Sequence, residues 1–206
     1  MTKEQQHIED IQTIKEMMSK STQFMSLSGI SGILAGMYAL VAAYFANSSI
    51  YSNQTYLAYR KADITSESIT SLVLIAMVTL ILSIGSGVFF SGRKAKRNNE
   101  TLWNEQAKRL LINLAIPLAT GGLLCLILLA KGYVGVIAPL TLIFYGLALV
   151  NASKYTLTEV RGLGILEIAL GLIAMQFMGY GLLFWAIGFG ILHIIYGISM
   201  YLKHGA

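Results

Sequence analysis

The sequence predicts an all-α polytopic membrane protein, a bundle of six transmembrane helices in three hairpins with an N-terminal amphipathic surface helix. Of the 206 residues, 55% are hydrophobic and only 12% are charged, which is about half the charged share of a typical soluble domain. Apolar runs recur along the whole chain, and each is close to the ~20 residues that cross a bilayer as a helix. None of them alternates apolar and polar residues as a membrane β-strand does.

The elements follow in order along the chain. Residues 1–22 are expected to form a cytoplasmic amphipathic helix, because Ile8, Ile11 and Ile14 recur on one helical face. Residues 23–206 are expected to form the transmembrane domain. Its spans are predicted at residues 24–46, 69–91, 110–130, 134–150, 163–178 and 182–202.

The distribution of Lys and Arg predicts the orientation. An even number of spans places both termini on one side, and twelve of the 15 Lys and Arg residues fall on that side, with only Arg60, Lys61 and Lys131 on the other. Positive residues favour the cytoplasmic side, so both termini are expected in the cytoplasm. The net charge of +5 is thereby explained without nucleic acid. The basic cluster after the second span is expected to meet anionic lipid headgroups; it consists of Arg93, Lys94, Lys96 and Arg97.

Glu167 is the only charged residue well inside an apolar run. A charge in hydrocarbon costs at least a few kcal/mol, about 2.5–3.5 on insertion scales, so it persists where a partner or a function holds it. His193 is the expected partner, because Glu167 lies thirteen residues before the turn at Tyr180 and His193 thirteen residues after it. The two side chains should therefore lie at equal depth in the last hairpin. Such a pair either locks the hairpin or carries protons in a transport path.

Small residues predict where helices approach each other closely. Gly171 shares the face of Glu167, and Gly190 and Gly197 share the face of His193, so these two faces are expected to pack against each other. In the first span, small residues recur at every fourth position and predict another close contact; they are Ser28, Gly32 and Gly36. This face serves packing within the bundle or, alternatively, a homo-oligomer.

A second polar seam is predicted in the middle hairpin. Asn113 and Asn151 fall at similar depth near the cytoplasmic end. Pro117 removes the helical hydrogen bond to the carbonyl of Asn113. The opened helix either lines an ion or substrate site or is a kink that neighbouring groups satisfy.

The last hairpin resembles a known family. Its first helix carries Leu163–Ala174 (LGILEIALGLIA), and its second is glycine-rich and ends in Tyr196-Gly197-Ile198. This pattern is similar to the hairpin unit of HdeD-like six-span bacterial inner-membrane proteins. The resemblance implies three such hairpins, a bacterial inner membrane and an association with acid stress. It implies no functional residue and no established chemistry.

A second resemblance concerns Gly29-Ile30-Ser31-Gly32, which is similar to the nucleophile motif of rhomboid intramembrane proteases. Their base also lies in the sixth span, as His193 does. However, the rhomboid serine lies in the fourth span rather than the first, and the other rhomboid motifs have no counterpart here.

These patterns favour a non-enzymatic multi-pass protein of structural, accessory or stress-related function, with no metal and no cofactor. The first alternative is a small proton-linked transporter or channel that uses Glu167 and His193. The second alternative is an intramembrane serine hydrolase.

Overall fold

The computed structural model describes residue 5 and residues 27–50, 66–97 and 103–204. Over these residues the chain is helical apart from short connections, and the described part contains no β-strand. The all-α prediction is therefore confirmed at this level. The surface helix expected over residues 1–22 lies outside the described residues except for Gln5, as does most of the connection between the first two spans.

Five helices of the described part are long and apolar enough to cross a membrane. The first four in the chain begin and end near the predicted spans; they are α2 (Gly29–Ile50), α3 (Ser66–Arg97), α4 (Glu105–Ala130) and α5 (Ile137–Ala152), the last extended by the 3-10 turns η1 (Val134–Val136) and η2 (Ser153–Tyr155). The fifth is the final helix, from Gly181 to Lys203. Between these lies α6 (Glu159–Gln176), which has 18 residues and three charged side chains.

The final helix differs from the continuous span predicted at residues 182–202. After the turn η3 (Met178–Tyr180) it begins as α7 (Gly181–Trp185), widens into a π-helix over η4 (Ala186–Leu192) and continues as α8 (His193–His204). A π-helical segment of this length is rare, and such segments occur frequently at functional sites.

Local sequence explains where α4 begins and ends. The side chain of Asn104 accepts a hydrogen bond from the backbone N–H of Ala107 at 2.8 Å, which caps the first turn. At the other end Gly132 has a φ of 83°, a left-handed conformation that glycine adopts without steric cost. This glycine lets the chain reverse within a few residues and enter η1.

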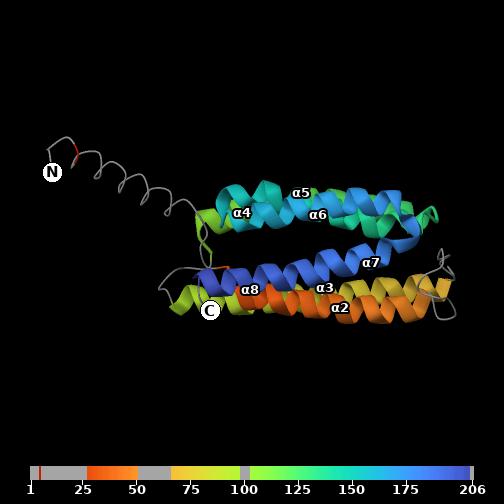
Figure 1. Ribbon diagram of the computed structural model, residues 1–206, viewed down its shortest axis with the longest axis horizontal. Coiled ribbons are helices and arrows are strands. Elements are labelled where there is room, and N and C mark those ends of the chain that lie inside the picture. The colour runs from red at the N-terminus through yellow and green to blue at the C-terminus, as the bar shows by residue number, and fades with distance from the viewer. Residues whose placement is uncertain (1–4, 6–26, 51–65, 98–102, 205–206) are drawn as a thin grey trace.

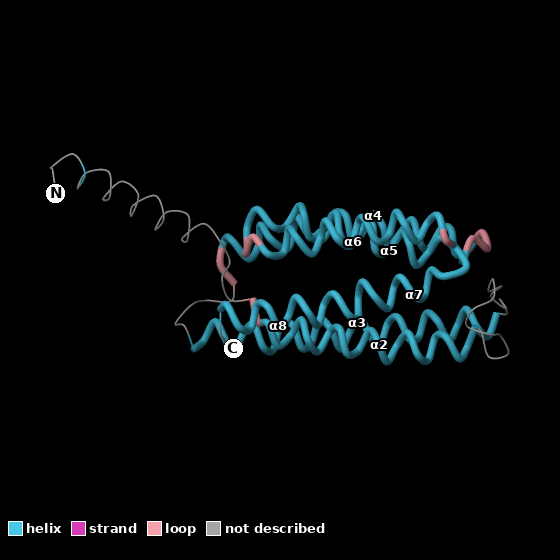
Figure 2. Tube along the Cα trace, in the orientation of Figure 1, coloured by secondary structure: helices cyan, strands magenta, loops and turns pink. Residues whose placement is uncertain are grey.

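The helices form two layers of three (Figure 1). One layer contains α4, α5 and α6, and the other contains α2, α3 and the final helix. The trace in Figure 2 shows α7 leaning from the end of α6 toward α2, so that the final helix crosses from one layer to the other. The first two sequential pairs, α2 with α3 and α4 with α5, pack directly. The third pair packs less closely, because α6 packs mainly on α5 and the final helix mainly on α2, although α6 and the final helix also touch each other.

Glycines hold the helices of each layer together. In one layer a β-carbon on Gly36 would lie 2.6 Å from the carbonyl oxygen of Gly190, and one on Gly32 would lie 3.2 Å from the α-carbon of Gly197. In the other layer a β-carbon on Gly146 would lie 2.5 Å from the carbonyl oxygen of Gly164. Backbones this close require glycine, which is the packing expected between helices in lipid.

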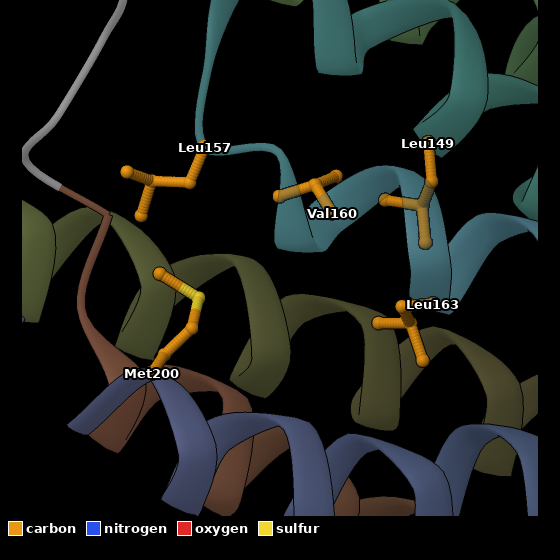
Figure 3. Close-up of a cluster of buried hydrophobic side chains, with 5 residues drawn as sticks. All are labelled: Leu149, Leu157, Val160, Leu163 and Met200. Carbon is orange, nitrogen blue, oxygen red and sulfur yellow. The ribbon is translucent and has the colours of Figure 1, made fainter. Parts of the chain in front are cut away.

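The two layers are joined by a cluster of buried apolar side chains (Figure 3). Met200 of α8 belongs to one cluster with buried side chains from α5, α6 and the connection between them; these are Leu149, Leu157, Val160 and Leu163. An ion pair of 3.4 Å between Lys203 and Glu159 bridges α8 and α6 near the same end. At this end of the bundle the interface between the layers therefore combines an apolar cluster with one ion pair.

Candidate functional site

Glu167 and His193 face each other across the interface between the layers. Glu167 lies in the middle of α6 and is 0% exposed, and His193 begins α8 and is 6% exposed. Glu167 Oε1 lies 3.4 Å from His193 Nδ1. The structure thus brings together the two residues that the sequence places at equal depth.

Both ring nitrogens of His193 have a closer partner than Glu167. Nδ1 lies 2.9 Å from the carbonyl oxygen of Gly188, and Nε2 lies 2.8 Å from the hydroxyl of Tyr145. A carbonyl oxygen only accepts, so Nδ1 carries the proton and donates to Gly188. In the neutral ring Nε2 then accepts from the hydroxyl of Tyr145.

The carboxyl group of Glu167 is left without a hydrogen bond. Although Oε1 approaches His193 Nδ1, the proton on that nitrogen points to Gly188, and neither Glu167 oxygen has a hydrogen-bond partner among the described residues. The hydroxyl of Tyr196 on α8 is also buried and also has no hydrogen-bond partner among the described residues. Buried polar groups in proteins are almost always hydrogen-bonded, so each exception asks for an explanation.

Gly188 makes the space that the Glu167 carboxyl occupies. A β-carbon on Gly188 would lie 2.5 Å from Glu167 Oε2 and 2.5 Å from a methyl carbon of Leu142. The Leu170 side chain would lie 3.2 Å away. The π-helical backbone at Gly188 is therefore the floor of the site, and side chains of the opposite layer cover it.

Aromatic rings continue the site along the final helix. The rings of Tyr145 and Phe189 lie 4.9 Å apart, and those of Phe189 and Trp185 lie 5.1 Å apart. The His193 ring is 5.3 Å from Tyr145 and 5.7 Å from Phe189. The side chains of Trp185 and Phe189 are partly exposed, whereas His193 is buried. The four rings thus extend from a more exposed part of the helix to the buried carboxyl group.

The small faces beside Glu167 and His193 do not meet each other, so that expectation is wrong. A β-carbon on Gly171 would meet Ile143 and the carbonyl of Pro139 on α5. One on Gly190 would meet Leu40 on α2, and Gly197 packs against the backbone near Gly29. Each face seals a seam within its own layer, because the pattern shows that a helix is approached closely and not which helix approaches it. Ser28 is buried, as are Gly36 and Gly197.

The second polar seam is closed by a single hydrogen bond. The side-chain amide of Asn151 on α5 donates to the backbone carbonyl of Asn113 on α4 at 2.9 Å. Pro117 leaves this carbonyl without its helical donor. The side-chain amide of Asn113 itself donates to the carbonyl of Arg109 at 2.8 Å. Of the two interpretations, the arrangement fits a kink that a neighbouring helix satisfies.

Two other candidate groups are arranged differently from the expectation. The Ser31 hydroxyl donates to the Ser28 carbonyl at 2.6 Å, while both His193 nitrogens face Tyr145 and Gly188, so these residues do not form a serine–histidine pair. In the basic cluster Lys94 is buried and its ammonium donates to the carbonyl of Leu27 at 3.2 Å. Only the other three members are exposed; they are Arg93, Lys96 and Arg97.

Sequence reasoning missed Tyr145, Gly188 and Phe189 as parts of the site. Tyr145 stands in a Tyr-Gly pair that has a counterpart at Tyr196-Gly197, and this was the available signal. No sequence signal singled out Gly188, because several other glycines lie in the same helix. No group of three or more His, Cys, Asp or Glu side chains that could hold a metal occurs among the described residues.

No family model, no curated protein and no solved structure matches this chain. The resemblance of the last hairpin to the HdeD-like family therefore stays a prediction that rests on its own residues.

Proposed function

We propose that this chain is a non-enzymatic, six-span protein of a bacterial inner membrane with both termini in the cytoplasm. Five helices of sufficient length and apolarity support this, together with α6, whose Glu159 and Arg161 lie at its first turns. The surface of α3 also supports it, because no residue of its most apolar stretch is buried. Such a surface is suited to lipid rather than to water.

We further propose that the protein is a small proton-linked transporter or channel, with Glu167 as the proton-carrying group. The observation that carries this is the fully buried Glu167 carboxyl group, neither oxygen of which has a hydrogen-bond partner among the described residues. An unsatisfied buried polar group costs about 1–3 kcal/mol. A purely structural pair would be expected to satisfy its own hydrogen bonds.

His193, which is hydrogen-bonded to Tyr145, is a second group that can take up the proton. The hydroxyl of Tyr145 donates to Nε2 of the neutral ring. When Nε2 takes up a proton, the Tyr145 hydroxyl must turn and accept instead, and the imidazolium then lies beside Glu167 Oε1. Histidine is the side chain that titrates nearest to physiological pH. Protonation of His193 and of Glu167 is thereby coupled, because the two groups lie 3.4 Å apart and each charge affects the other.

Infrared difference spectroscopy of the reconstituted protein tests this function without knowledge of a substrate. Between about pH 5 and 8, a carbonyl-stretch band of a buried carboxyl group is expected to appear or disappear in the wild type. It should be absent in Glu167→Gln and retained in Glu159→Gln, whose carboxylate lies on the same helix and pairs with Lys203. A wild-type spectrum without a Glu167 band over this range would refute the proton-carrying role.

A structural or accessory function is the second candidate, and the close packing at Gly188 favours it. Leu142, Leu170 and the Glu167 carboxyl all approach this glycine closely, so Glu167 and His193 can serve as a polar lock between the layers. This candidate expects no carboxyl band that responds to pH, so the same spectra separate the two.

A further inference from the structure

We propose that Glu167 and the aromatic side chains of Tyr145, Phe189 and Trp185 form a binding site for a monovalent organic cation, which replaces the proton on Glu167. This proposal rests on the proton-linked function and names the class of ligand that the function would serve. It concerns a site at the interface between the layers, where Glu167 is 0% exposed.

The charge of Glu167 has no fixed partner in the site. The nearest nitrogen, His193 Nδ1, donates its proton to the Gly188 carbonyl. The ion pair of Glu159 with Lys203 lies elsewhere, near the end of the bundle. An ionised carboxylate in a membrane interior needs a counter-charge. A proton provides it by neutralisation, and a bound cation provides it by pairing.

The rings determine which kind of cation fits. Tyr145, Phe189 and Trp185 form a continuous set, with centroids 4.9 and 5.1 Å apart between neighbours. The negative faces of aromatic rings attract organic cations, and sets of such rings recognise quaternary ammonium groups. Metal cations such as Ca²⁺ require six or more oxygen ligands. The described residues offer one carboxylate here and no cluster of metal-binding side chains.

The site has a place where such a ligand can enter. Within each layer the helices touch through backbone, as Gly36 and Gly190 do. Across the interface the three atoms nearest to a β-carbon on Gly188 all belong to side chains, those of Leu142, Leu170 and Glu167. New rotamers of these side chains open space over Gly188 without breaking a backbone seam. The partly exposed rings of Trp185 and Phe189 lead to this point.

Binding must release a proton. Glu167 Oε2 lies in the space above Gly188, and Oε1 lies 3.4 Å from His193 Nδ1. A neutral carboxylic acid has no charge to pair with a cation, so the carboxyl group must give up its hydrogen when the cation binds. The O–H bond breaks, the proton passes to water, and the carboxylate pairs with the bound cation. Charge is conserved, because one positive charge leaves as another enters. Such an exchange couples movement of the cation to a proton gradient.

Tetraphenylphosphonium is a suitable probe, since it is monovalent, quaternary and surrounded by aromatic groups. Its binding to the purified full-length protein in detergent is measured by isothermal titration calorimetry in two buffers of different ionisation enthalpy. We expect one saturable site per chain and release of about one proton per cation bound. Phe189→Leu should weaken binding roughly fivefold, the effect of one aromatic face in a partly desolvated site.

Glu167→Gln should abolish both binding and proton release, whereas Glu159→Gln should retain both. Size-exclusion chromatography establishes whether each variant is folded. If Glu167→Gln does not fold, the number of protons that the wild type releases per bound cation still tests the proposal. The absence of saturable binding in the wild type would overturn the proposal, as would unchanged binding by folded Glu167→Gln. If binding is absent while the infrared band of Glu167 responds to pH, the organic-cation site is refuted and the proton-linked function stands.

Discussion

The side-chain amide of Asn151 donates to the backbone carbonyl of Asn113, 38 residues earlier in the chain, at 2.9 Å. This is the one carbonyl of α4 that Pro117 deprives of its helical donor. A helix of the same layer thus supplies from a side chain the hydrogen bond that the proline removes. In a membrane, helix-breaking residues are tolerated where neighbours satisfy the freed backbone in this way.

We expect Asn151→Ala to lower the free energy of unfolding by about 0.5–1.5 kcal/mol, since it leaves the Asn113 carbonyl without a donor. In a Pro117→Ala background the restored N–H of residue 117 can bond to that carbonyl, so the same change should cost less. Unfolding of the full-length protein in mixed micelles with increasing SDS measures both. Equal costs in the two backgrounds would show that the hydrogen bond is not what Asn151 contributes.

The second prediction concerns Glu167 and His193. Glu167→Gln and His193→Ala should each destabilise the protein, by about 1–3 kcal/mol, because each disturbs a buried polar arrangement. The double variant should lower the free energy of unfolding by less than the sum of the two single variants, because the interaction between the two side chains is lost only once. The same SDS titration supplies the four values of the cycle. Strict additivity would mean that the 3.4 Å approach of the two side chains contributes nothing.

The third prediction concerns the seams within the layers. Gly36→Leu and Gly171→Leu should each cost more than about 2 kcal/mol, because a side chain there meets backbone atoms of Gly190 or Pro139 within 3 Å. Gly85→Leu on α3 is the matched control, since a β-carbon there has no neighbour within 4 Å. Detergent stability of the three variants gives the comparison. If the control were as unstable as the other two, close packing would not be the reason for these glycines.

The fourth prediction concerns orientation. Because twelve Lys and Arg residues fall on the side of the termini and three on the other, we expect both termini to lie in the cytoplasm. In a Cys125→Ser background, single cysteines at positions 97 and 53 are treated with a membrane-impermeant thiol reagent in intact cells. Position 53 should be labelled, and position 97 only after the cells are opened. The opposite pattern would reverse the proposed orientation.

The sequence predicts much of the secondary structure and less of the packing. Apolar runs of spanning length predict the helices, and the start of α4 lies five residues before its predicted span because Asn104 caps polar residues outside the apolar run. Equal distance from Tyr180 predicts that Glu167 and His193 lie at the same depth, because depth follows from helical rise alone. Which helices lie side by side depends on which helix packs against which glycine-containing face. All of these faces have the same local sequence pattern, so the pattern does not identify the partner helix.

The details of the candidate site could not be predicted from the sequence, because they also depend on which helices pack together. The π-helix over Ala186–Leu192 changes which residues face the other layer, and the apolar run predicts only a continuous helix there. Tyr145 comes from α5, which the expected hairpin pairing does not place beside His193. Gly188 is recognisable only once the Glu167 carboxyl is seen to occupy the space of its missing side chain.

The order of the helices has a consequence for biogenesis. Among the described spans the final helix is synthesised last, yet it fills the glycine face of α2, which is synthesised first. Until the ribosome has released the final helix, α2 has only α3 beside it, and the insertion machinery or lipid must cover Gly29, Gly32 and Gly36. A chain that stops after Gln176 keeps the complete layer of α4, α5 and α6 but leaves the other layer open. Pulse-chase labelling should therefore show rapid degradation of that truncated chain, because membrane proteases act on the helices that its missing last segment would have sealed.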